Sequence, residues 1–100
     1  MKLGMLVNTN TQLPAVVGIT KAALAKGHTV NIFAMDDGTR LLSDSAFTGL
    51  SQAAGVSMAF CDHSAQHLGT KPDGLPSQIS VGSQFDNATM NHEVDRVIVL

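Results

Sequence analysis

Short apolar runs of strand length alternate along this chain with segments that carry helical periodicity. Apolar side chains at i, i+3, i+4 and i+7 predict a helix from Leu13 to Leu24, and a later helix is expected over residues 85–93. Strands that alternate with helices predict an α/β fold with a mainly parallel sheet. The expected strands lie at residues 3–8, 28–35 and 56–61, in a short extended piece at Ile79 and Val81, and at residues 96–100.

The second expected strand is apolar on both faces. Val30, Ile32 and Ala34 lie on one face, and Phe33 and Met35 on the other. Such a strand is covered on both sides, as in a doubly wound three-layer fold. After it, a turn is expected at residues 36–39, and Ser43-Asp44-Ser45 can cap a helix. That helix would carry Phe47, Leu50, Ala53 and Ala54 and end at Gly55.

Length and composition limit the classes of protein to consider. One hundred residues predict a single domain over residues 1–100. Charged residues make up 14%, compared with roughly 25% in typical soluble domains, so we expect a homo-oligomer that covers part of the surface. Scattered basic residues and the absence of Trp and Tyr argue against nucleic acid as a partner. No apolar run approaches bilayer length, and the single cysteine favours a reducing, cytoplasmic location without membrane association.

Polar residues follow three of the expected strands. Ligands of open α/β sheets gather at the carboxyl ends of the strands, so Asn8, Thr11, Asp36 and residues 61–64 are expected to converge there. Asn8 and Thr11 can donate to an anion or cap the helix, and Asp36 with Asp37 can act as paired carboxylates or form a turn. The chain has neither a G-x-G-x-x-G nor a G-K-[ST] motif, so no cofactor is predicted.

Cys61 stands at the carboxyl end of a strand and the amino end of a helix. Helix N–H groups favour the thiolate there, which makes Cys61 a candidate nucleophile or sulfur carrier. Val56, Met58 and Phe60 share one strand face, so Cys61 is expected on the other, where an imidazolium at His63 would further lower the thiol pKa. The alternative is a small, buried, unreactive side chain.

A second alternative is a metal site. Cys61, His63 and His67 have the spacing of half a zinc site, although histidines four residues apart also occur on solvated helix faces.

Three segments together resemble the DsrE/DsrF-like (TusD-like) family of sulfur-relay proteins. They are Gly27-His28-Thr29-Val30-Asn31-Ile32-Phe33 with Asp36-Asp37-Gly38, Cys61-Asp62-His63-Ser64-Ala65-Gln66-His67-Leu68-Gly69, and Gly82-Ser83-Gln84-Phe85-Asp86 with residues 94–100. The resemblance implies a flavodoxin-like three-layer α/β fold that assembles into trimers or hexamers.

The resemblance also implies a function. In sulfur-carrying members, the cysteine that matches Cys61 accepts a persulfide sulfur from a donor protein and passes it to an acceptor protein. Carriers often have Arg-Arg before the glycine, where this chain has His67-Leu68. The expected catalytic residues are Cys61 and His63, and the expected substrate-binding residues are Asn8, Thr11, Asp36, Asp62 and Ser64. A small-molecule or protein-binding module without thiol chemistry is the main alternative to a sulfurtransferase-like carrier.

Overall fold

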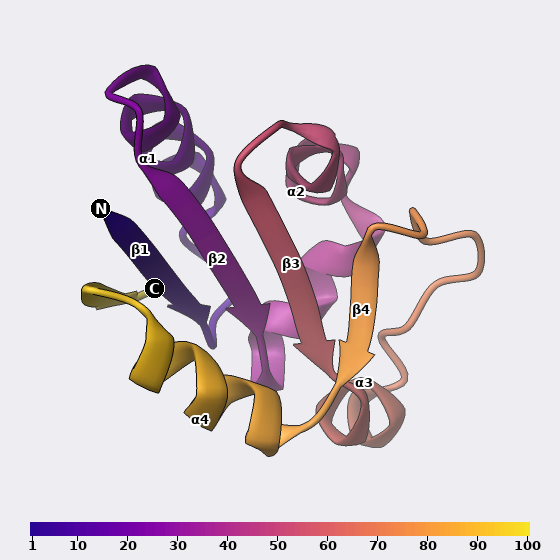
Figure 1. Ribbon diagram of the computed structural model, residues 1–100. Coiled ribbons are helices and arrows are strands. Elements are labelled where there is room, and N and C mark those ends of the chain that lie inside the picture. Colours follow the sequence, from indigo (N-terminus) through magenta and orange to yellow (C-terminus); the bar gives the residue numbers. More distant parts are fainter.

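A computed structural model describes all 100 residues as an α/β domain (Figure 1). In chain order the elements are β1 (Lys2–Val7), α1 (Leu13–Ala25), β2 (Thr29–Ala34), the 3-10 helix η1 (Asp36–Ser43), α2 (Ser45–Thr48), the 3-10 helix η2 (Gly49–Gln52), β3 (Val56–Cys61), α3 (Asp62–Leu68), β4 (Ile79–Gly82), α4 (Gln84–Glu93) and β5 (Arg96–Val99). No helix is long and apolar enough to cross a membrane.

All strand pairs are parallel, and the sheet order is β4-β3-β2-β1-β5. The predicted α/β class is confirmed, and each long strand begins and ends within one residue of its expected bounds. Parallel neighbours need crossover connections, and helical segments lie in each connection between consecutive strands.

The main core lies on one face of the sheet, between the strands and the helices α1 and α2. Alternate residues of β1, β2 and β3 point into it, so that the register aligns Met5, Ile32 and Met58 across three strands. The fully buried Phe47 and Phe60 fill the space beneath α2 and at the end of β3. Burial of this apolar surface supplies most of the driving force for folding.

Only α4 packs on the opposite face, where it contacts β1 and β2 (Figure 1). Crossovers between parallel strands are right-handed, so a connection that reverses direction across the sheet passes over the other face. Gly4 permits the close approach of α4, because a Cβ there would meet Val94 Cγ2 at 2.9 Å and Met90 Cγ at 3.5 Å. The expected three layers are present, but one of the outer layers is a single helix.

The expectation of one continuous helix before Gly55 is wrong, because the segment divides into a short α-helix and a 3-10 helix. Asp44 caps a helix as predicted, since its Oδ1 accepts from the Ala46 N–H at 2.9 Å, but α2 ends at Thr48 and continues as η2. Ser51 Oγ donates to the Thr48 carbonyl at 2.7 Å. Side-chain hydrogen bonds of this kind compete with the regular α-helical pattern and favour short 3-10 turns. The expected turn at residues 36–39 is the start of η1.

Gly38 of η1, which follows β2, packs against Val7 at the end of β1. A Cβ at this position would lie 1.9 Å from the Val7 carbonyl oxygen, far inside the contact distance, so only glycine fits. The contact holds η1 against the carboxyl edge of the sheet, where the polar residues of the candidate site gather.

We expect Gly38→Ala to lower the free energy of unfolding by about 3 kcal/mol or more, because backbone must move to relieve the overlap. Gly18→Ala is the matched control: a Cβ there meets nothing within 4 Å, and alanine should stabilise the middle of α1 by about 0.5–1 kcal/mol. Urea denaturation followed by circular dichroism measures both. Equal midpoints for Gly38→Ala and the unmodified protein would contradict the close contact.

Candidate functional site around Cys61

Cys61 is the last residue of β3 and the residue from which α3 begins, as the sequence predicted. Its strand register with Gly82 places the side chain on the α4 face, opposite Met58 and Phe60. There it packs in a small cluster with Phe33 and Met90.

The thiol is buried. Cys61 is only 3% exposed and lines none of the surface depressions, which agrees with the burial, though not with the inertness, of the alternative that the sequence left open. The cover comes from β2 and α4, whose residues are distant from Cys61 in the sequence. A reagent can reach the sulfur only if this cover opens locally.

Donor groups nevertheless favour the thiolate. Burial raises the pKa of the Cys61 thiol, but the hydroxyl and backbone N–H of Ser64, the side chain of Gln84 and the backbone N–H of His63 together lower that pKa below its ordinary value. The donors at the start of α3 thus do what the strand-to-helix position predicted.

The role expected for the His63 imidazolium is corrected. His63 lowers the thiol pKa through its backbone N–H, and its exposed ring lies nearly parallel to that of His67, with the centroids 6.4 Å apart. The ring faces a polar pocket and not the sulfur.

This polar pocket, of about 260 Å³, lies between η1 and α3. Its lining comprises Asp36, Asp37, His63, Ser64, His67 and Leu68. Asp36 has a left-handed backbone (φ 47°), which turns the chain from β2 into η1. The buried Thr39 fixes η1 against the residue that follows α3, because its Oγ1 lies 2.6 Å from Thr70 Oγ1. Ser64 belongs both to this pocket and to the surroundings of the thiol.

The remaining expected site residues lie elsewhere. Asp62 faces Lys71, whose Nζ is 3.7 Å from Asp62 Oδ1, an ion-pair distance at which that oxygen accepts no hydrogen bond. Asn8 and Thr11 follow β1, which β2 separates from β3, and neither lines a pocket. Neither caps α1, whose flanking Gln12 makes no side-chain cap hydrogen bond.

The geometry gives the metal alternative no support. No group of three or more His, Cys, Asp or Glu side chains lies close enough together to hold a metal ion. Cys61 packs on the α4 face, whereas His63 and His67 line the polar pocket between η1 and α3, so the expected ligand set is not assembled.

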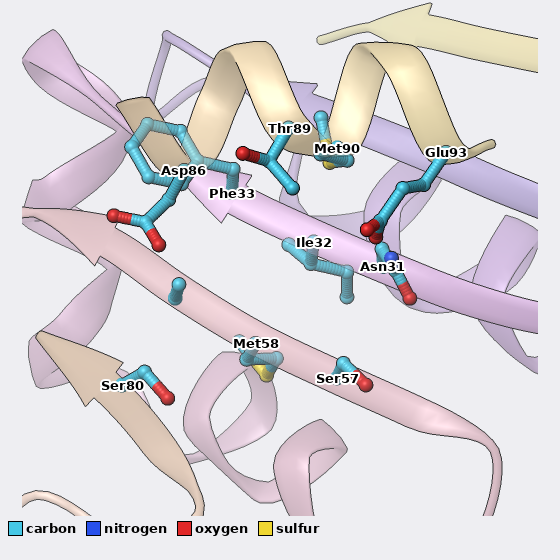
Figure 2. Close-up of a pocket in the computed structure, with 11 residues that line it drawn as sticks. Asn31, Ile32, Phe33, Ser57, Met58, Ser80, Asp86, Thr89, Met90 and Glu93 are labelled. Carbon is cyan, nitrogen blue, oxygen red and sulfur yellow. The ribbon is translucent and has the colours of Figure 1, made fainter. Parts of the chain in front are cut away.

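A groove of about 190 Å³ lies beside α4 on the half of the sheet that this helix leaves open (Figure 2). Asp86, Thr89 and Glu93 of α4 border it on one side, and Ser57 and Ser80 border it from the strands. Its floor includes Phe33 and Met90, the two residues that also pack against Cys61. The groove thus lies directly beside the cover of the thiol.

No sequence motif pointed to Gln84 as a site residue. Its Nε2 donates to Met35 Sδ at 3.7 Å, and its side chain is among the groups that lower the pKa of Cys61. The usable sequence signal was Ser83 with Asp86, a capping box that fixes the start of α4 at Gln84.

These features define a class: a small all-parallel α/β domain with a single cysteine at a strand end, under the helix that crosses back over the sheet. The sequence matches the DsrE/DsrF-like family over residues 1–100, and the chain belongs to this family. The resemblance that the motifs indicated is therefore confirmed.

Two solved structures share the fold. The ychN protein from E. coli superposes with a TM-score of 0.75 at 13% sequence identity, covering 100% of each chain. MTH1491 from Methanobacterium thermoautotrophicum, a protein of unknown function, superposes with a TM-score of 0.78 at 14% identity, covering 99% of this chain and 98% of that one. No curated protein matches the sequence.

We expect Ser64→Ala to shift the pH midpoint of Cys61 alkylation to higher pH, because the variant loses a hydroxyl that lowers the thiol pKa. A lowered pKa means that the thiolate persists to lower pH in the unmodified protein, so the variant should react more slowly at neutral pH. Iodoacetamide rates measured across pH give the midpoint. Ser57→Ala, an exposed serine on the same strand as Cys61, is the control. Identical midpoints for the two variants would contradict the role of Ser64.

Proposed function

We propose that this protein is an intracellular sulfur carrier that holds a persulfide on Cys61. The observation that carries the proposal is a thiol of lowered pKa at the start of a helix, in a chain that belongs to the DsrE/DsrF-like family. Sulfur transfer begins with attack by a thiolate, so a thiol that ionises more readily suits this chemistry.

The transfer needs no external oxidant or reductant. The Cys61 thiolate attacks the outer sulfur of a donor persulfide, the S–S bond of the donor breaks, and the donor leaves as a thiolate. Cys61 then carries the outer sulfur as its own persulfide. In the second step an acceptor thiolate attacks that outer sulfur, and Cys61 returns to the thiolate.

The single cysteine makes the protein a relay and not an endpoint. With no second thiol in the chain, a persulfide on Cys61 has no internal thiol to resolve it, so its sulfur passes to another molecule. Donor and acceptor proteins are therefore the proposed partners. A reducing compartment suits the carrier, because competing oxidation of the thiol is suppressed there.

The polar pocket is the proposed contact region for these partners. Asp36, His63 and His67 are exposed at its rim, while Ser64 connects it to the surroundings of the sulfur. Polar rims with exposed side chains are typical of transient protein contacts.

We also propose a homo-oligomer, a trimer or hexamer. Val97 and Val99 of the edge strand β5 are 37% and 58% exposed, and their register with Gly4 and Leu6 places both on the α4 face. Few charges interrupt the surface of a chain with 14% charged residues. A second copy that packs on β5 would remove both valines from water.

A binding module without thiol chemistry is the second candidate. The groove beside α4 favours it, because this depression combines an apolar floor with carboxylates and hydroxyls (Figure 2). Small-molecule sites have this mixture of apolar walls and a few polar groups.

Brief exposure to polysulfide should add sulfur to the unmodified protein and not to Cys61→Ser, since that variant lacks the only thiol. Intact-mass spectrometry reads the added sulfur, and a reductant should remove it. An unmodified protein that gains no sulfur, with Cys61 also inert to alkylation after long incubation, would overturn the carrier and favour the binding module.

Gel filtration with light scattering should find an oligomer, and Val99→Glu should shift it towards the monomer because a charge would be buried against the second copy. Ala22→Glu, a change at an exposed position of α1, is the control and should leave the oligomer intact. A monomeric unmodified protein at micromolar concentration would show the oligomer proposal to be wrong.

A further inference from the structure

The strand order places one side chain across the carboxyl end of β3. β3 lies between β4 and β2 and ends at Cys61. Gln84 follows the end of β4, and Met35 follows the end of β2. Because Gln84 Nε2 donates to Met35 Sδ at 3.7 Å, the Gln84 carboxamide spans the end of the strand that lies between them.

The capping box fixes the position of Gln84 in the chain, and one further hydrogen bond holds its side chain. The capping box sets Gln84 as the first residue of α4: the Ser83 N–H donates to Asp86 Oδ2 at 2.7 Å, and the Phe85 N–H to Ser83 Oγ at 3.2 Å. Asn87 Nδ2 then donates to Gln84 Oε1 at 3.1 Å. The amide oxygen is thus engaged on the side of α4, which leaves the amide nitrogen to donate to Met35 Sδ beyond the end of β3.

Gln84 differs in exposure from the residues that pack against Cys61. Phe33 and Met90, which pack against Cys61, are 2% and 5% exposed and belong to the packed interior. Gln84 is exposed to solvent, and its contact with the thioether of Met35 is a weak hydrogen bond. Because Gln84 lies outside the packed interior, its side chain can turn without moving Phe33 or Met90.

We propose that Gln84 is a positioning residue that covers the Cys61 sulfur and holds an amide N–H donor against it. The inference rests on the proposed carrier function, and it names the group that governs access to the carrier thiol. The direction of the Cys61 pKa shift agrees, because the Gln84 side chain is one of the groups that lower it.

Two substitutions of Gln84 distinguish its effect on access to the Cys61 sulfur from its effect as an N–H donor. Gln84→Ala removes both, whereas Gln84→Met keeps a side chain of similar length without an N–H donor. Gln78→Ala, at an exposed glutamine outside the helices, is the matched control. Iodoacetamide rates measured across pH on the full-length protein give two numbers: the plateau rate at high pH, which reports access, and the pH midpoint, which reports the donor.

Gln84→Ala should raise the plateau rate about threefold or more and move the midpoint to higher pH, because reactivity follows both access and thiolate fraction. Gln84→Met should move the midpoint in the same direction and keep the plateau of the unmodified protein. If Gln84→Ala matched Gln78→Ala in both numbers, the proposal would be wrong. An equal rise of the plateau in Gln84→Met would assign the effect to loosened packing of α4, which also overturns it.

Persulfide uptake is read separately from alkylation. Unchanged alkylation profiles with normal uptake would overturn the role of Gln84 and leave the carrier proposal standing. Profiles that respond as expected in a protein that takes up no sulfur would overturn the carrier proposal alone.

Discussion

The return of the chain from β4 to β5 is the constraint on which the site depends. β4 and β5 lie at opposite edges of an all-parallel sheet, so the connection between them crosses the face that the other helices leave free. A single helix, α4, makes this crossing, and Gly4 lets it approach the sheet closely. Met90 of this helix packs against Cys61 together with Phe33, while the half of the face that the helix leaves open forms the groove.

The sequence predicted the local placement of the cysteine well. Alternation along β3 assigned Cys61 to the face opposite Met58 and Phe60, and the change from strand to helix located the N–H groups that lower its pKa. The sequence left burial open as an alternative and could not name the covering residues, because Phe33 and Met90 come from other elements and meet Cys61 only through tertiary packing. Because His63 is close to Cys61 in the sequence, its ring was expected to act on the thiol, but the ring lines the pocket at η1.

The sequence predicted that more loops meet at the site than the structure brings together there. All carboxyl ends of a parallel sheet lie at one edge, but neighbouring strands are about 4.8 Å apart, so the order of the strands decides which loops meet. Asn8 follows β1, two strands from β3, whereas Asp36 follows β2, the immediate neighbour of β3. Thr9 uses its hydroxyl to bind the Leu100 carbonyl at 2.9 Å, which joins the β1 loop to the end of β5 instead. Periodicity alone does not give that order.

The pairing of β5 with β1 joins segments at opposite ends of the chain. Leu3 lies opposite Arg96, whereas the other three strand pairs, β1 with β2, β2 with β3 and β3 with β4, join strands that are consecutive in the sequence. Long loops close late because their entropy is lost before their contacts form, so α4 and β5 are the segments expected to dock last. During folding, and in any partly opened state that releases this terminal unit, the Cys61 sulfur lacks the cover that Met90 provides. A newly made chain would therefore pass through an interval in which its thiol meets the solvent before its own fold shelters it.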